Sequence, residues 1–371
     1  MQKEPIRVAQ IIGKMAAGGV EAVVYNYYRA INHSAVQFDF FVDDDSSAEF
    51  PRQLLDMGAR VYPIPPYRKP LAYLSALIRS FRQNHYQIVH AHVNTMNVFP
   101  LFAAWWAKVP VRICHNHSTA DWGEKKKTLL KYLLRPFAKV FATEYFACGE
   151  KAGRWMYGNH SFESGKVHVM TNAIDTGKFS FDLAARRRLR EELSIGQDVF
   201  VVGHVGRFTY AKNHEFLLRI FQAVLLQCED ARLLLVGEGE RMEYIRTEAQ
   251  KLGLADKVCF TGSRADVNEL YSVMDVFCLP SFYEGFGVVA LESQANGLKC
   301  VLSDRVPSEA DVTGTSAFLP LSAQPQKWAQ ELLAQQGSPR RDQSDEVKEA
   351  GYDIAQSAAE LAAYYQSCLR R

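Results

Sequence analysis

Residues 281–292 read SFYEGFGVVALE, and this stretch decides the fold of the region around it. It follows an apolar run, residues 276–280, that is typical of a buried strand, and Val288 begins a pattern that is typical of a helix. Gly285 and Gly287 let the loop backbone approach a ligand closely. The segment therefore predicts a strand, a tight loop and a helix whose first N–H groups can bind an anion.

Two carboxylates in this stretch, Glu284 and Glu292, are eight positions apart. Glu284 falls in the predicted loop, and Glu292 falls about one turn into the predicted helix. Carboxylates accept hydrogen bonds from sugar hydroxyls, so the pair suits a ribose and a transferred sugar on either side of a phosphate. The alternative interpretation is two solvated glutamates beside a helix start.

The stretch resembles the donor-site signature of family 4 glycosyltransferases, which are retaining enzymes of the GT-B fold. Further stretches agree with that family in the same order along the chain: Gly18-Gly19-Val20-Glu21, Asn172-Ala173-Ile174-Asp175, Gly206-Arg207 with Lys212-Asn213, Val236-Gly237-Glu238-Gly239, and Phe260-Thr261-Gly262-Ser263-Arg264. The resemblance implies an α/β chain with two doubly wound, Rossmann-like domains that face each other across a cleft.

Strand-like and helix-like segments alternate in both halves of the chain, which predicts parallel sheets covered by helices on both faces. We expect an acceptor-binding domain over 1–175 and a nucleotide-sugar donor-binding domain over 176–351. The final segment, 352–371, is predicted to be a helix, and the resemblance implies that it packs back on the first domain. The arginine-rich stretch that follows Asp175 is interpreted as a connector, and residues 336–349 as a loop.

The resemblance also assigns roles to individual side chains. Arg207 and Lys212 would stabilise the diphosphate, Glu284 would contact the transferred sugar, and Glu292 would bind the ribose. Among the histidines after two neighbouring strands, His117 is favoured as the one near the transferred sugar. The other candidates are His90, His92 and His115 on the acceptor side, and Gly18, Gly19, Gly237, Arg264, Phe286, Gly287, Val288 and Val289 on the donor side.

The run Asp43-Asp44-Asp45 offers the D-x-D pattern by which another glycosyltransferase fold binds a metal. Because it follows the second predicted strand, we interpret it as a solvated strand end. The resemblance implies no metal and no other cofactor, since cationic side chains and a helix terminus would stabilise the leaving diphosphate.

Composition limits the partners and the compartment. A net charge of +2 argues against a dedicated nucleic-acid binder, and seven cysteines without a C-x-x-C pair fit a reducing compartment. The longest apolar stretch, residues 98–107, is too short to span a bilayer. We expect a cytoplasmic protein, peripheral at the cytoplasmic face of the plasma membrane.

A basic amphipathic stretch over residues 124–141 predicts that membrane contact. Lys127, Lys131, Arg135 and Lys139 recur at every fourth position, with leucines and phenylalanines on the other side. Alternatively, the leucines pack on the protein's own core and the basic face is solvated.

The sequence thus predicts a hexosyltransferase that uses a nucleoside diphosphate sugar, with UDP as the expected nucleotide. The expected acceptor is a growing, lipid-linked glycan of a surface polysaccharide such as a capsule or an exopolysaccharide. Two alternatives stay open: a nucleotide-sugar epimerase of GT-B architecture, and a non-catalytic partner subunit that binds nucleotide sugar for another transferase.

Overall fold

The structure is a computed structural model that describes residues 4–15, 19–118 and 125–370, with only the backbone of residues 125–128. The chain divides into two compact units. The first unit holds the chain up to Ala173 together with the residues from Asp353 onward, and the second unit is Ile174–Tyr352. Each unit has its own sheet.

The first unit is built on a parallel sheet with the strand order β3-β2-β1-β4-β5-β6-β7 among the described residues. Every residue of β2 is buried, because helices cover both faces of the sheet. The strands are β1 (Ile6–Gly13), β2 (Val36–Asp43), β3 (Arg60–Ile64), β4 (Ile88–Ala91), β5 (Val111–Asn116), β6 (Glu144–Ala147) and β7 (Val167–Val169).

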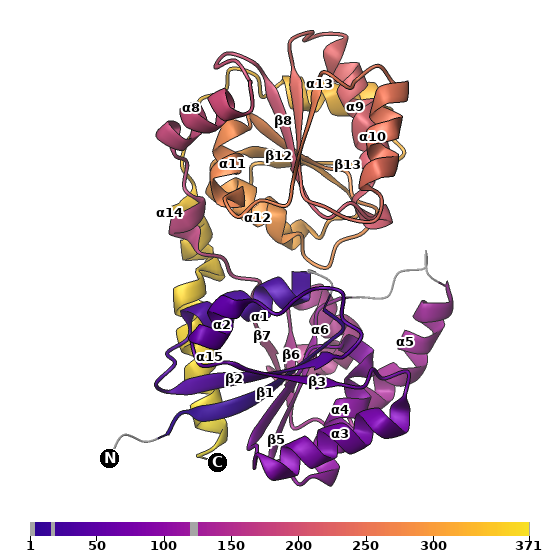
Figure 1. Ribbon diagram of the computed structural model, residues 1–371, viewed down its shortest axis with the longest axis vertical. Helices are drawn as coiled ribbons and strands as arrows, with labels where there is room; N and C mark the ends of the chain where they lie inside the picture. The colour runs from indigo at the N-terminus through magenta and orange to yellow at the C-terminus, as the bar shows by residue number, and fades with distance from the viewer. Residues whose placement is uncertain (1–3, 16–18, 119–124, 371) are drawn as a thin grey trace. The chain divides into compact units, whose positions relative to one another are not determined.

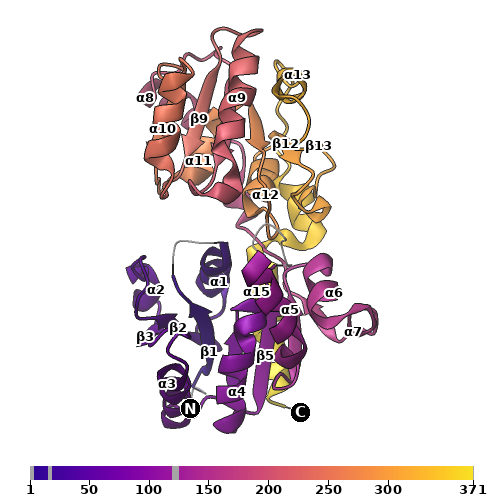
Figure 2. The same cartoon turned by 90° about the vertical axis from the view of Figure 1, so that its right-hand side faces the viewer.

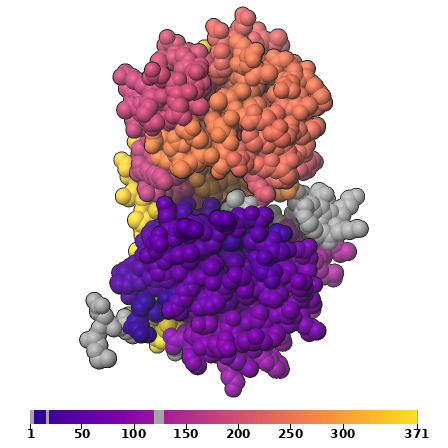
Figure 3. All heavy atoms as spheres, viewed as in Figure 1, coloured from indigo at the N-terminus to yellow at the C-terminus, as the bar shows by residue number. Residues whose placement is uncertain are grey.

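Helices α3 and α4 lie in front of this sheet in Figure 1, and the C-terminal helix α15 (yellow) runs behind it. In the space-filling view, α3 and α4 belong to the face of the first unit that is turned to the viewer (Figure 3). Helix α6 contacts β6 and β7, and α7 lies against α6 (Figure 2). The helices of this unit are α1 (Gly19–Ala30), α2 (Arg52–Asp56), α3 (Pro70–Gln83), α4 (Val98–Trp106), α5 (Lys125–Ala138), α6 (Glu150–Tyr157), α7 (Asn159–Glu163) and α15 (Ile354–Cys368), with the short turn η1 (Asn94–Asn97).

Side chains of the first sheet alternate between its two faces, as the period of a strand requires. Ala9 and Ile11 of β1 pack into the core that α3 and α4 share. Gln10, between them, points to the opposite face, where it contacts Tyr365 of α15. The same alternation places His90 of β4 on the α15 face.

The second unit has a parallel sheet with the strand order β10-β9-β8-β11-β12-β13 among the described residues. Figure 1 shows α9, α10 and α13 on one side and α8, α11 and α12 on the other, and two separate cores fill the spaces between helices and sheet. The strands are β8 (Val201–Val205), β9 (Arg232–Val236), β10 (Val258–Gly262), β11 (Val276–Leu279), β12 (Lys299–Ser303) and β13 (Ser316–Leu319).

The helices of the second unit alternate with these strands in chain order. They are α8 (Leu183–Glu192), α9 (His214–Leu225), α10 (Met242–Lys251), α11 (Val267–Val273), α12 (Val288–Ala295), α13 (Pro325–Leu333) and α14 (Ser344–Val347), with the short turns η3 (Thr176–Phe179), η4 (Tyr210–Lys212), η5 (Ser308–Ala310) and η6 (Lys348–Tyr352).

The arginine-rich stretch was interpreted wrongly as a connector, because most of it forms α8. Asp182 caps this helix by accepting hydrogen bonds from the N–H groups of Ala184 and Ala185. Arg190 is fully buried, and its guanidinium binds the Asp275 carboxylate at 2.8 Å as well as several backbone carbonyls. The arginines of this helix therefore hold it on the second sheet.

The segment 336–349 was also interpreted wrongly as a loop throughout. It contains α14 and the start of η6. Its Arg340 donates hydrogen bonds to the backbone carbonyls of Tyr271 and Met274 and lies with its guanidinium over the ring of Phe181. This polar stretch, which looks solvated in the sequence, therefore packs against the second unit through Arg340.

Candidate donor site and histidine cluster

Two loops at the carboxyl ends of adjacent central strands meet in the second unit. The loop after β8 carries Lys212, and the loop after β11 carries Glu284. Nζ of Lys212 donates a hydrogen bond of 2.7 Å to Oε1 of Glu284, and Oγ of Ser281 donates a second one of 2.7 Å to the same oxygen. The ion pair is mostly buried, with 16% of the lysine and 12% of the glutamate side chain exposed.

The same two loops are joined through their backbones as well. The N–H of Phe282 donates to the carbonyl of Ala211 at 2.8 Å, and the amide of Asn213 donates to the carbonyl of Pro280 at 3.0 Å. The rings of Tyr210 and Phe282 stack with their centroids 4.7 Å apart. These contacts fix the position of Lys212 relative to Glu284.

Helix α12 begins directly after the second of these loops. Gly287 precedes it with a φ of +93°, and a Cβ there would lie 3.3 Å from a methyl group of Val306. The side chain of Phe286 is buried and stacks on Tyr352, so any contact of Phe286 with a ligand would be through its backbone. Val288 and Val289 are the first residues of α12, where N–H groups lack intrahelical partners.

Glu292 lies on α12, and its Oε2 accepts a hydrogen bond of 2.7 Å from the hydroxyl of Tyr271. Burial raises the pKa of the Glu292 carboxyl to about 7, although the Tyr271 hydrogen bond and the charges of Lys212 and Lys178 lower it. The carboxyl therefore changes charge near neutral pH.

Arg207 follows β8, and its guanidinium lies 3.6 Å from the Glu240 carboxylate with 42% of the side chain exposed. The loop after β9 packs against the backbone at Gly206, next to Arg207. A Cβ on Gly237, whose φ is +135°, would lie 2.3 Å from the carbonyl oxygen of Gly206. Only a glycine allows these two loops to approach so closely.

The structure does not bring Arg264 into contact with the other predicted donor residues within the described chain. Its guanidinium binds Asp266 at 2.7 Å and Glu192 at 2.8 Å. At the other predicted glycine pair, Gly19 is the first residue of α1, and Gly18 lies outside the described residues.

The four predicted histidines lie together in the first unit. His90 lies on β4 and His92 lies directly after its end. His115 and His117 have the same positions on the neighbouring β5. All four are buried on the α15 face, with the rings of His115 and His117 stacked at 3.9 Å. Burial lowers the pKa of His117 to about 3 and those of the other three well below the usual value, so the cluster is neutral at physiological pH.

Nitrogens of His90, His92 and His115 lie within 4.8 Å of one another, a spacing at which imidazoles can share a metal ion. Several of these nitrogens already have partners inside the cluster. Nε2 of His90 lies 3.1 Å from Nδ1 of His115, and Nδ1 of His92 lies 2.9 Å from Nε2 of His117. The arrangement is a hydrogen-bonded one.

The interpretation of the aspartate run as a solvated strand end was wrong for one of its members. Asp43 is the last residue of the fully covered β2 and is 3% exposed, whereas Asp44 is exposed and Asp45 binds Arg68. Burial, helped by the neighbouring aspartates, raises the pKa of Asp43 to about 6. Its Oδ1 is buried without a hydrogen-bond partner among the described residues.

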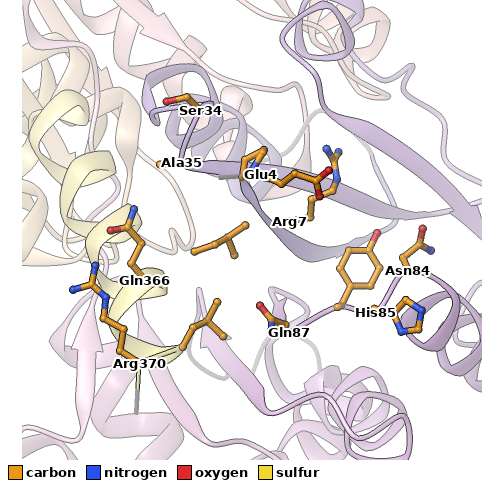
Figure 4. A pocket seen from close by; sticks show the side chains of 13 residues that line it. Glu4, Arg7, Ser34, Ala35, Asn84, His85, Gln87, Gln366 and Arg370 are labelled. Atoms are coloured by element: carbon orange, nitrogen blue, oxygen red, sulfur yellow. The ribbon is translucent and has the colours of Figure 1, made fainter. Parts of the chain in front are cut away.

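Asp43 lines a cavity of about 280 Å³ at the carboxyl ends of β1, β2 and β4. His92, Asn94, Tyr67 and Tyr73 share this lining, so hydrogen-bonding groups and aromatic rings face the same space. A second cavity, of about 770 Å³, lies at the opposite ends of the strands, where Arg7, His85 and Arg370 line it (Figure 4). Of these two cavities, the smaller one reaches the cluster of four histidines, through His92.

Sequence reasoning did not identify four residues of these sites. Ser281 stood inside the quoted stretch, and its position three residues before Glu284 was the available signal. Tyr271, Gln10 and Tyr365 reach their partners from elements distant in sequence, and no local pattern marks them.

An apolar stripe is exposed on α5. Leu129, Leu133 and Phe137 have 62%, 60% and 56% of their surface exposed. Arg135 instead lies over the ring of Trp155, and Nζ of Lys139 lies 3.5 Å from the carbonyl of Tyr157. Pro136 is inside the helix, and the side chain of Lys127 lies outside the described residues. In the described part of the chain, no helix has the length and apolar character to cross a membrane.

Two Rossmann-like units, with cations and carboxylates gathered at the strand ends of one of them, define a glycosyltransferase of the GT-B fold. The model for glycosyl transferases group 1 matches residues 185–332, and the model for glycosyltransferase family 4 matches residues 17–178. The chain is 33% identical to EpsF of Bacillus subtilis strain 168 over 98% of its own length and 97% of that protein. It belongs to glycosyltransferase family 4, and the expected fold class is confirmed.

Other relatives show how widely the fold is shared. The chain is 26% identical, over 64% of its length and 62% of the relative's, to the Escherichia coli UDP-Gal:α-D-GlcNAc-diphosphoundecaprenol α-1,3-galactosyltransferase. Anabaena HepE, solved in complex with UDP-glucose, matches with a TM-score of 0.79 at 18% identity over 98% of this chain and 99% of its own. WaaG, a glycosyltransferase of lipopolysaccharide biosynthesis, matches with a TM-score of 0.66 at 14% identity over 96% of this chain and 95% of its own.

If Glu292 binds the ribose of a nucleotide, as the sequence predicts, the pKa of its carboxyl determines how nucleotide binding depends on pH. A protonated carboxyl accepts fewer hydrogen bonds than a carboxylate, so the affinity for UDP, measured by calorimetry, should fall as the pH decreases from 8 to 6. Tyr271→Phe removes a hydrogen bond that lowers this pKa and should move the transition to higher pH. Glu292→Gln is the control, because the phosphates of UDP also titrate in this range. An equally large change of UDP affinity with pH in that variant would contradict the assignment of Glu292 to the nucleotide.

Proposed function

We propose that the protein transfers a hexose from a nucleoside diphosphate sugar, with UDP as the nucleotide, to a lipid-linked glycan with retention at the anomeric carbon. The observation that carries this proposal is the buried Lys212–Glu284 pair at the strand ends of the second unit, beside the start of α12. The complex of HepE with UDP-glucose supports the choice of donor.

The donor site divides into three parts. Lys212 and Arg207 bind the diphosphate and stabilise the negative charge that develops as it leaves, and the first N–H groups of α12 add to this stabilisation. Glu284 accepts hydrogen bonds from hydroxyls of the transferred sugar. Glu292 accepts hydrogen bonds from the ribose, with Tyr271 holding its carboxyl in place. These cations act without a metal.

The acceptor side is the cavity that Asp43 lines in the first unit. The unpartnered Oδ1 of Asp43 can accept a hydrogen bond from an acceptor hydroxyl, and the rings of Tyr67 and Tyr73 supply faces against which a sugar ring can pack. His117 lies beside this cavity through its contact with His92 and would face the transferred sugar.

A membrane surface would present the lipid-linked acceptor. The exposed apolar stripe of α5 is suited to the boundary between headgroups and acyl chains, with basic residues on the same helix near the anionic surface. The E. coli relative supports the choice of acceptor, because its name specifies a diphosphoundecaprenol-linked sugar.

Incubation of the purified protein with UDP-glucose, UDP-galactose, UDP-N-acetylglucosamine and GDP-mannose tests the donor assignment. Release of UDP from one donor, followed by mass spectrometry, is the expected result. Conversion of a nucleotide sugar into an isomer without release would identify an epimerase instead. No turnover of any donor, also with acceptor present, would indicate a non-catalytic subunit.

Lys212→Ala and Arg207→Ala should each lower the rate of UDP release about 100-fold or more, the scale expected for loss of one preorganised charge donor. Lys251→Ala is the matched control, because Lys251 is an exposed lysine paired with a glutamate on α10. Thermal unfolding monitors the fold of each variant. Turnover at the parental rate in both site variants would contradict the donor assignment.

Asp43→Asn should raise the KM for the acceptor about tenfold, the scale of one hydrogen bond to a charged group, and leave the hydrolysis of the donor unchanged. The acceptor in this assay is a short-chain diphospholipid-linked N-acetylglucosamine. Asp44→Asn is the matched control, because Asp44 is the exposed neighbour in the same run. Equal acceptor KM values in all three proteins would contradict the acceptor assignment.

Leu133→Glu combined with Phe137→Glu should abolish co-sedimentation with vesicles of phosphatidylcholine and phosphatidylglycerol, because both side chains are exposed and available to the membrane. Leu226→Glu, on an even more exposed leucine of the second unit, should bind as the parent does. If the parent does not bind vesicles at low salt, where surface charges are least screened, the membrane assignment is wrong.

A further inference from the structure

Six polar side chains on the α15 face of the first sheet form one continuous hydrogen-bonded series. We call it the histidine chain, and it runs through His117, His92, Gln10, Tyr365, His90 and His115. Each member is at least nine-tenths buried. Because water does not supply alternative partners at such sites, the donor and acceptor at each link are determined by the neighbouring links.

The half of the chain that ends at His117 can be followed atom by atom. Oε1 of Gln10 lies 2.8 Å from Nε2 of His92, and an amide oxygen can only accept, so this nitrogen carries the hydrogen. His92 is neutral, so its Nδ1 is an acceptor. That Nδ1 lies 2.9 Å from Nε2 of His117, which must therefore donate. Nδ1 of His117 is left with a lone pair.

The other half of the chain follows the same direction. Nε2 of Gln10 donates to the hydroxyl of Tyr365 at 3.2 Å, and this hydroxyl donates to Nδ1 of His90 at 2.7 Å. Nε2 of His90 then donates to Nδ1 of His115 at 3.1 Å. Nε2 of His115 is the end of the chain and has no partner among the described residues.

We propose that Gln10 and Tyr365 are positioning residues that hold His117 as its Nε2–H tautomer, so that Nδ1 accepts a hydrogen bond from a hydroxyl of the transferred sugar. The contact of His117 with the sugar rests on the proposed function, whereas its tautomer does not. The direction of the chain can change only if the amide of Gln10 turns over. While the Tyr365 hydroxyl is present, that turn also reverses His90 and His115, and the links therefore change together.

The two positioning residues are far apart in the sequence. Gln10 is on β1 and Tyr365 is on α15, a separation of 355 residues. The preceding residue on the helix, Tyr364, donates instead to the Glu144 carboxylate and is not part of the histidine chain. Tyr364 therefore provides a matched control for the loss of a tyrosine hydroxyl at the same helix.

Nuclear magnetic resonance of the full chain with ¹⁵N-labelled histidine reads the tautomer directly, since the protonated and unprotonated nitrogens of a neutral imidazole have separate shifts. The His117 signals are assigned by their loss in His117→Gln. The parent should show hydrogen on Nε2 of His117. Tyr365→Phe lets Gln10 turn independently, and Gln10→Met removes both amide contacts, so both variants should show a mixture of tautomers. Tyr364→Phe should match the parent.

Turnover provides the second readout. The rate of UDP release should fall about tenfold in Tyr365→Phe and Gln10→Met, the lower end of the range for residues that orient a ligand-contacting side chain. The affinity for UDP should stay at the parental value. Gln10→Met keeps the test valid if Tyr365→Phe does not fold, as judged by thermal unfolding.

Three results would overturn the tautomer assignment: hydrogen on Nδ1 of His117 in the parent, hydrogen on both nitrogens at neutral pH, or one unchanged tautomer in every folded variant. A change of tautomer with full turnover would support the assignment of Gln10 and Tyr365 and overturn the contact of His117 with the sugar. Failure of the donor assay in the parent would refute the proposed function and leave the spectra as an independent test.

Discussion

The reversal of strand order at the middle of each sheet is the constraint on which both sites depend. Neighbouring central strands, β8 with β11 and β1 with β4, send their following helices to opposite faces, so the loops at their carboxyl ends diverge and leave a space. In the second unit the loops that carry Lys212 and Glu284 meet at this point in the sheet. In the first unit the corresponding loops line the cavity that contains Asp43 and His92.

Partial burial gives the charged groups at these strand ends their properties. Lys212 is held by a carboxylate that also binds Ser281, so the ammonium group is oriented before any ligand arrives. Glu292 keeps a raised pKa because burial outweighs the favourable effects of a tyrosine hydroxyl and two lysines. A buried charge is costly unless it is paired, and here Lys212 is paired with Glu284 while Glu292 accepts the hydroxyl of Tyr271. Sites of this kind are ready for ligands of complementary charge.

The sequence predicted those features that a local pattern encodes. The strands of both sheets except β13, the loop of Glu284 and the start of α12 follow from periodicity and glycine placement. Asp43 was misjudged because three successive aspartates look solvated, although cover from both faces of the sheet decides burial. Arg190 and Arg340 were misjudged for the same reason, since their carbonyl and carboxylate partners are tens of residues away. Helices α6, α7 and α13 went unpredicted, and the partners of the histidines are tertiary contacts that no spacing reveals.

The location of α15 has a consequence for how the protein is made. The strands of the first sheet are synthesised before the second unit, but the helix that covers the histidine face of this sheet is synthesised after it. Until then Gln10, His90 and Phe38 of β2 lack the cover that Tyr365 provides. Contacts of such long sequence separation form late and slow the folding of a domain. The second unit can fold before α15 is synthesised, whereas the first must wait for that helix, and a nascent chain that lacks it would expose a polar sheet face to chaperones and proteases.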